Sequence, residues 1–146
     1  MTADRLESDL AEALRAGETE RVGVLRLVKT ALKNEVIKTR QPLNEDEVIR
    51  VIGRQAKQRR DSIAAYTEAG RQDLAKVEEG ELAIIKEYLP EALSEAELTQ
   101  LVDQVMTETG ATEMSQAGTV IGAVMARAAG KADGAAVAAA VRQHLS

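Results

Sequence analysis

The sequence contains no cysteine, tryptophan or phenylalanine, and its single histidine, His144, is the penultimate residue. The absence of cysteine excludes a disulfide framework, a thiolate nucleophile and a zinc or iron–sulfur centre with Cys ligands. A single histidine in that position excludes a metal site with several His ligands, and it leaves no base for a His-dependent catalytic triad. We therefore expect no metal and no other cofactor.

Long hydrophobic runs are also missing. No stretch of about 18 apolar residues is present, so the sequence predicts no transmembrane segment. The N-terminus, Thr2-Ala3-Asp4-Arg5, has no basic region leading into an apolar stretch, so we expect no signal peptide. From these absences we expect a cytoplasmic protein without a membrane partner.

The chain is acidic and almost free of aromatic side chains. Its 19 Lys and Arg residues stand against 24 Asp and Glu residues, which gives a formal net charge of −5. This balance argues against a general nucleic-acid coat protein, which needs an excess of positive charge. With only Tyr66 and Tyr88 as aromatics, the core must consist of Leu, Ile, Val, Ala and Met. The chain also lacks the aromatic platforms on which unpaired bases usually stack.

Hydrophobic residues recur with a period near 3.6 along the whole chain, which predicts an all-α fold. Asn44 and Ser94 are each followed three residues later by Glu, as expected for helix N-caps, and Gly70 is a C-terminal stop signal. Pro42 and Pro90 interrupt the pattern, because proline and the residue before it disfavour helix. The predicted helices end near residues 17, 40, 70, 89, 110, 129 and 146.

The composition changes after Pro90. Residues 91–146 contain 14 Ala in 56 positions and carry a net charge of −4, whereas residues 1–90 carry −1. We predict two packed helical domains: residues 1–90 with about four helices and residues 91–146 with a three-helix bundle.

The predicted third helix carries a basic stretch. On a helical wheel Arg50, Arg54 and Lys57 share one narrow arc, well away from the apolar stripe, and Arg60 lies on a flank. Cations one turn apart suit successive phosphates along a nucleic-acid strand. The alternative is a solvated face whose cations pair with neighbouring acids. Arg59 lies beside the apolar stripe, and we expect its guanidinium to pair with a carboxylate.

Lys131 lies in a turn, Gly130-Lys131-Ala132-Asp133-Gly134, between the last two predicted helices. A cation just before a helix N-terminus could assist in contacting a phosphate or carboxylate. The alternative is a simple inter-helix turn, in which Gly130 has a positive φ and Asp133 caps the next helix.

No set of residues assembles a catalytic centre with a nucleophile, a base and an oxyanion hole. Glu78, Glu79 and Glu81 are predicted to form a solvated helix face. Tyr66 and Tyr88 are predicted to lie at the edge of the core with their hydroxyls at the surface. The sequence thus favours a protein that is not catalytic on its own.

Several short segments resemble the YqeY-like proteins, in the same order along nearly the whole chain. They are Leu25-Arg26-Leu27, Lys33-Asn34-Glu35, Lys57-Gln58-Arg59-Arg60-Asp61-Ser62-Ile63, Ala69-Gly70-Arg71-Gln72-Asp73-Leu74, Glu87-Tyr88-Leu89-Pro90 and Gly130-Lys131-Ala132-Asp133-Gly134. The resemblance implies two helical domains. The family is similar to the C-terminal tail region of the B subunit of aspartyl/glutamyl-tRNA amidotransferase, a helical region that helps hold tRNA.

This resemblance implies a link to carbon–nitrogen ligase chemistry with glutamine as amido donor. The chain itself has no Ser-Ser-Lys centre of the amidase type and no ATP site. It departs from the family at residues 117–121, Ala-Gly-Thr-Val-Ile, where a run of the Met-Gly-Lys-Val-Met type is expected, and so it lacks one cation there.

Two functions follow as hypotheses. In the first, the protein is a tRNA-associated adaptor in which Arg50, Arg54, Lys57 and Arg60 contact phosphates and Lys131 assists, with an amidotransferase or an aminoacyl-tRNA synthetase as a further partner. In the second, it is a protein–protein interaction scaffold without RNA binding, recruiting such an enzyme or another copy of itself through an apolar groove or stripe.

Overall fold

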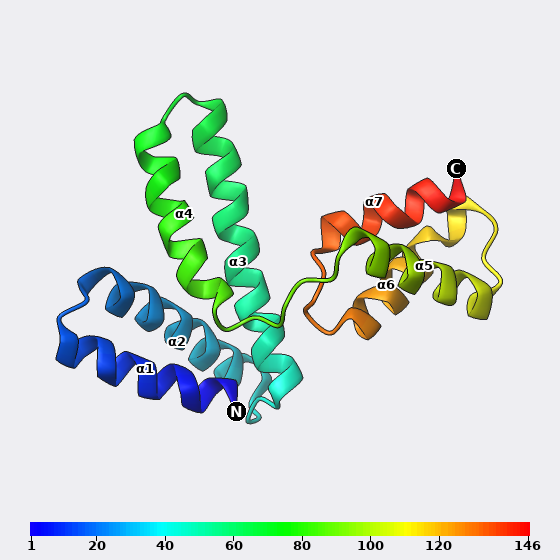
Figure 1. Ribbon diagram of the computed structural model, residues 1–146. Helices are drawn as coiled ribbons and strands as arrows, with labels where there is room; N and C mark the ends of the chain where they lie inside the picture. Colours follow the sequence, from blue (N-terminus) through cyan, green and yellow to red (C-terminus); the bar gives the residue numbers. More distant parts are fainter. The chain divides into compact units, whose positions relative to one another are not determined.

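The computed structural model describes residues 1–146, which form seven α-helices, one short 3-10 helix and no strand. This confirms the all-α prediction. The chain divides into two compact units, Met1–Leu89 and Pro90–Ser146, which are described separately below. Figure 1 labels the helices of both units.

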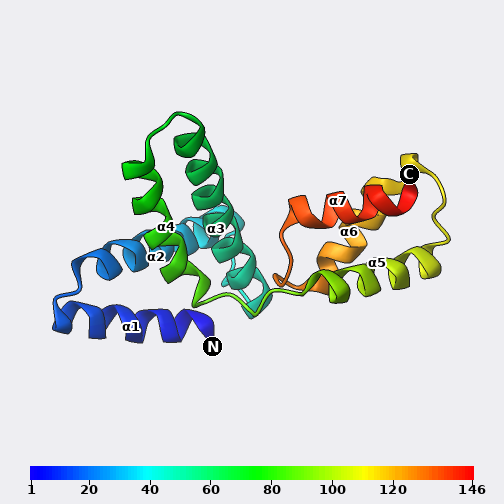
Figure 2. The same ribbon diagram turned by 45° about the horizontal axis from the view of Figure 1, so that its top comes forward.

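The first unit contains α1 (Thr2–Ala16), α2 (Thr19–Thr39), α3 (Glu45–Glu68) and α4 (Gln72–Lys86). In Figures 1 and 2, α1 and α2 form one antiparallel hairpin and α3 and α4 form a second. The base of the second hairpin packs on the first, and its distal part extends away from α1 and α2. We call residues 57–81, this distal part, the hairpin arm.

Local signals place the helix ends where the sequence predicts them. At the start of α3 the Asn44 side chain accepts a hydrogen bond from the Glu47 backbone N–H at 2.9 Å, and the Glu47 carboxylate accepts one from the Asn44 N–H at 3.3 Å. This capping box satisfies two helix N–H groups reciprocally. After α3, Gly70 has φ +73°, a conformation that glycine adopts without steric cost. The prediction for α4 was three residues too long, because residues 87–89 continue as i to i+3 turns.

The core of the first unit lies where α1, α2 and the base of the second hairpin meet. Leu25, Ile52 and Ile85 are fully buried there; burying such side chains contributes roughly 1.5–3 kcal/mol each. Two residues that continue the apolar period of their helices, Val36 and Val77, are nevertheless exposed. Val36 lies in the C-terminal half of α2, and Val77 lies on the hairpin arm, which is only two helices thick.

The second unit contains α5 (Glu95–Thr109), the short 3-10 helix η1 (Met114–Gln116), α6 (Ala117–Ala128) and α7 (Gly134–Leu145). The Ser94 hydroxyl accepts a hydrogen bond from the Glu97 N–H at 3.1 Å and so caps α5. The buried cluster of the second unit consists only of Val and Ala side chains: Val102, Val105, Ala111, Ala117, Val120, Val124, Val137 and Val141.

Candidate functional site

The predicted cations of α3 lie on its outer side. Arg50, Arg54 and Lys57 are exposed, and they lie away from the buried Ile52 and Ala56 of the same helix. The side chain of Arg54 is 52% exposed and that of Lys57 is 59% exposed. We call Arg50, Arg54 and Lys57 the α3 cation row.

Two of the three members of the α3 cation row have carboxylate partners. Arg54 Nη2 lies 3.1 Å from Glu35 Oε2 of α2, and Lys57 Nζ lies 3.7 Å from Asp61 Oδ2 on the same helix. Arg50 forms no ion pair. Residues 50–60 contain no acid themselves; Asp61 follows them directly, whereas Glu35 lies on α2 and comes beside Arg54 only through the packing of the two helices. The spacing of Lys57 and Asp61, four residues apart on one helix, was a signal that could have revealed the second pair.

Arg59 has the structural role expected of it. Its side chain is 14% exposed, and Arg59 Nε lies 2.8 Å from Glu81 Oε2 and 3.6 Å from Glu78 Oε2 of α4. The contact is a charge pair without an aligned hydrogen bond, since Arg59 Nε has no hydrogen-bond partner. The prediction of a solvated face was wrong for Glu78 and Glu81, because both face α3 inside the hairpin arm. Arg60 is partly buried on the flank of the helix.

Lys131 belongs to the second unit and lies in the turn between α6 and α7. Its side chain is exposed, and its backbone carbonyl accepts a hydrogen bond from the Leu93 N–H at 2.7 Å. Gly130 has φ +83° as expected, and Ala129 also adopts the left-handed region, at φ +48°. Lys131 lines a shallow hollow with Gln100, Arg127 and other residues of α5 and α6.

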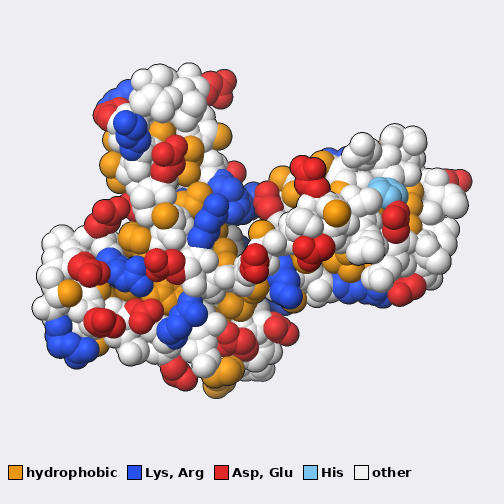
Figure 3. Space-filling view, viewed as in Figure 1, with side chains coloured by type: hydrophobic (Ala, Val, Ile, Leu, Met, Phe, Trp, Pro, Cys, Tyr) orange, Lys and Arg blue, Asp and Glu red, His pale blue; other side chains and the backbone are white.

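The surface of the first unit carries both signs of charge. In Figure 3, Lys and Arg side chains alternate with Asp and Glu over the face that is visible, without a broad field of one sign. On this face a polyanion would therefore meet separate cations rather than a broad positive field.

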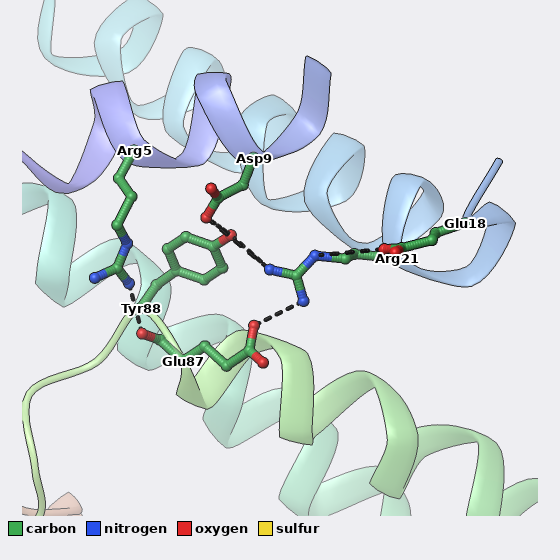
Figure 4. Close-up of polar contacts among 6 residues, drawn as sticks. All are labelled: Arg5, Asp9, Glu18, Arg21, Glu87 and Tyr88. Carbon is green, nitrogen blue, oxygen red and sulfur yellow. Dashed lines mark hydrogen bonds and ion pairs between the residues drawn. The ribbon is translucent and has the colours of Figure 1, made fainter. Parts of the chain in front are cut away.

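A polar cluster that the sequence analysis missed joins the end of α4 to α1 and α2 (Figure 4). The Tyr88 hydroxyl donates a hydrogen bond to Asp9 Oδ2 at 2.5 Å and accepts one from Arg21 Nη2 at 3.3 Å. Arg21 Nη1 donates to Glu87 Oε2 at 2.7 Å. The guanidinium of Arg5 lies 4.6 Å from the centre of the Tyr88 ring, a distance typical of a cation–π contact.

This cluster corrects the prediction for Tyr88. The residue is 3% exposed, so it belongs to the core and not to its edge, and its hydroxyl is bound rather than at the surface. Tyr66 is partly buried, as expected. The cluster connects three helices and therefore fixes the last turn of the first unit.

The Tyr88 hydroxyl should lose its proton at an unusually high pH. Burial, followed by its hydrogen bond to the Asp9 carboxylate, raises the pKa of Tyr88 to about 12. A group whose pKa is higher in the folded state than in the unfolded chain contributes full stability below the unfolded pKa, about 10 for tyrosine. This contribution is lost as the pH rises from 10 through 12.

Absorbance of tyrosinate checks this prediction, because the chain has only two tyrosines and no tryptophan. In a Tyr66→Phe variant the remaining tyrosine should ionise near pH 12 while the helix content is retained. The same variant in denaturant is the control and should ionise near pH 10. Ionisation of the folded variant near pH 10 would contradict the prediction.

The structure contains no group of three or more His, Asp or Glu side chains arranged to hold a metal ion. None of its helices is both long enough and apolar enough to cross a bilayer. What it offers is exposed cations on helix faces and one polar cluster that joins helices. These features define an all-helical protein of two compact units.

The chain belongs to the family described as Yqey-like protein, whose sequence pattern matches residues 3–145. This confirms the resemblance found from the short segments.

The chain is also similar to curated fungal proteins named "Altered inheritance of mitochondria protein 41, mitochondrial". The relative from Lachancea thermotolerans is 33% identical over 106 residues, which are 70% of this chain and 57% of that protein. The relative from Kluyveromyces lactis is 32% identical over 114 residues, 75% of this chain and 61% of that protein. The chain therefore spans about three fifths of the length of these two relatives.

These names overturn the expected cytoplasmic location. The similar curated proteins are named as mitochondrial proteins. The expectation failed because composition and hydropathy distinguish membrane-spanning from water-soluble segments but do not distinguish one aqueous compartment from another.

Proposed function

We propose that the protein is a non-catalytic helical adaptor that associates with tRNA, and that the α3 cation row contacts the RNA backbone. The observation that carries this proposal is the exposure of three cations, about one helical turn apart, on the solvent side of a 24-residue helix. Lys131 would add a contact from the second unit. The similarity of the family to the tail region of a tRNA-dependent amidotransferase suggests tRNA as the RNA and such an enzyme as the neighbour.

The two ion pairs of the α3 cation row are compatible with this function. Exposed ion pairs contribute only about 0–1 kcal/mol, so a phosphate can take the place of the carboxylate on Lys57 at little cost. Glu35 is less exposed than Asp61, so a phosphate should displace the carboxylate of Glu35 from Arg54 less completely. Recognition would rest on RNA shape and backbone, because the only two aromatic side chains, Tyr66 and Tyr88, are partly and almost fully buried.

Replacing Arg50, Arg54 and Lys57 together by Ala should weaken tRNA binding without unfolding the protein. Affinity for RNA falls as salt rises, and each lost phosphate contact reduces the steepness of log affinity against log salt by about 1. The slope of the triple variant should therefore be less steep by about 3. A gel-shift or filter-binding titration at several salt concentrations measures both values, and circular dichroism checks the fold.

A matched control is Arg15→Ala combined with Lys76→Ala and Lys86→Ala. These three exposed cations belong to the same unit and change the net charge equally, but they lie on α1 and α4. The control variant should keep the affinity of the unchanged protein. Equal affinity of the α3 variant and the unchanged protein at low salt would remove the proposal and leave the protein-scaffold alternative.

A further inference from the structure

The second helix carries exposed apolar side chains that its own fold does not use. Two of the seven exposed large hydrophobic residues of the protein, Leu27 and Ile37, lie on one side of α2, and a third, Val36, continues the core side of that helix. The opposite side of the same helix already contributes Leu25 and Val28 to the core. A helix that is apolar on two sides usually has a second partner.

The exposed residues form a regular row. Gly23, Leu27, Thr30, Asn34 and Ile37 follow one another at steps of 4, 3, 4 and 3 residues, and all five are exposed. They fall within an arc of roughly 80° on the helix surface. We call these five residues the outer stripe of α2. Alternating steps of three and four are the spacing with which one helix packs lengthwise on another.

Gly23 supports this interpretation independently. Glycine weakens the interior of a helix, and here no contact within the chain requires it, since a Cβ at this position would meet no atom within 4 Å. Its φ is not in the left-handed region. A glycine on the outer stripe lets the backbone of an approaching helix come close.

From Leu27 to its C-terminal end the outer stripe has only positive charges beside it, whereas Glu20 lies beside its first residue, Gly23. Arg26 and Lys33 flank it on one side and Lys38 on the other; all three are exposed and form no ion pair. The only acid between residues 21 and 40, Glu35, points away from the stripe and is bound to Arg54. An acidic protein thus has one helix face on which two large exposed aliphatic side chains, Leu27 and Ile37, lie between cations.

From this geometry we propose that the outer stripe of α2 is a docking surface for an amphipathic helix of another protein, with aliphatic side chains along its seam and Asp or Glu along its flanks. Charge complementarity selects the acidic flanks, and Leu27, at 51% exposure, and Ile37, at 65%, select the aliphatic seam. RNA fits less well, because phosphates gain nothing from two aliphatic side chains in the middle of the surface. A second copy of the chain fits less well too, because its most acidic helix, α5, exposes no large hydrophobic residue.

A photo-crosslinking residue in place of Thr30, in the centre of the outer stripe, tests the proposal in the full chain in cells. A matched control carries the same residue in place of Ala83, which is exposed on α4 of the same unit. The expected product is a peptide of another protein, specific to position 30, from a segment with Leu, Ile or Val at steps of three and four and acids beside them. The proposal is overturned if the residue at position 30 crosslinks to RNA, to lipid, to a second copy of the chain or to a protein segment without acidic flanks. It is also overturned if crosslinking at position 30 is no stronger than at position 83.

Charge reversal then tests whether the captured segment binds as proposed. A synthetic peptide of that segment should lose at least about tenfold in affinity when Lys33→Glu and Lys38→Glu are combined. The control pair Lys76→Glu and Lys86→Glu, exposed on α4, should leave the affinity unchanged. Equal effects of the two pairs overturn the proposal. The result is separate from the RNA proposal, which concerns the α3 cation row.

Discussion

Replacing Tyr88 by Ala is expected to lower the free energy of unfolding of residues 1–89 by about 3–5 kcal/mol. The side chain is almost fully buried among α1, α2 and the end of α4, so its removal leaves a cavity that the neighbouring helices cannot fill. The change also leaves the Asp9 carboxylate without its hydroxyl donor and the Arg5 guanidinium without its ring.

Tyr88→Phe separates the contribution of the buried ring from that of the hydroxyl's hydrogen bond. This variant keeps the ring and loses only the hydroxyl, so it should cost about 1.5–3 kcal/mol, the usual effect of removing a hydrogen bond to a charged group. Denaturant unfolding, read by hydrogen exchange in residues 1–89, measures both variants. The control is Tyr66→Ala on the hairpin arm, where a partly buried side chain is removed and a smaller loss is expected. Equal losses for Tyr88→Ala and Tyr88→Phe would contradict the packing argument.

Replacing Arg59 by Met is expected to destabilise the hairpin arm by about 2–3 kcal/mol. The change leaves Glu78 and Glu81, at 19% and 22% exposure, facing α3 without a cation. Removing one partner of a buried ion pair costs about 3–5 kcal/mol, and the partial exposure of these carboxylates reduces that value. Methionine preserves the packing of the aliphatic part of Arg59, so the loss reports on charge.

A second set of changes identifies the cause of that loss. Adding Glu78→Gln and Glu81→Gln to Arg59→Met should recover most of the stability, because the uncompensated charges are then gone. The control is Arg71→Met at the tip of the arm, where the cation and its partner Asp73 are both well exposed and little change is expected. Failure of the two Gln substitutions to restore stability would contradict the charge argument.

The helices could be predicted from sequence because their ends depend on neighbours in the chain. Asn44 caps α3 by binding an N–H three residues away, and Gly70 ends the helix by its own backbone freedom. Such signals need no knowledge of tertiary structure. The all-α class followed from the hydrophobic period for the same reason.

The charge partners could not be predicted in the same way. Arg59 meets carboxylates 19 and 22 residues further on, and Arg54 meets one 19 residues earlier, so both pairs depend on how neighbouring helices are aligned. A helical wheel of α3 alone placed Arg50, Arg54 and Lys57 on the outer side correctly, but it could not include Glu35 of α2. Tyr88 was misjudged because its environment is assembled from three helices.

The outer stripe of α2 was not recognised because the sequence analysis followed the apolar residues of that helix only as a core stripe. Leu27 and Ile37 were visible as additional apolar positions, and the excess of Lys and Arg between residues 21 and 40 was visible as well. Only burial reveals which of the two apolar sides of α2 is already occupied.

The valine and alanine cluster of the second unit limits how that unit can recognise anything. Valine has one side-chain torsion with a strong preference, and alanine has none, so the eight buried side chains have almost no alternative rotamers. Flexible methionines, Met106 and Met125, are found only at the edge of this cluster. Residues 90–146 should therefore meet a ligand as a preformed block, with selectivity set by shape match and little capacity for induced fit.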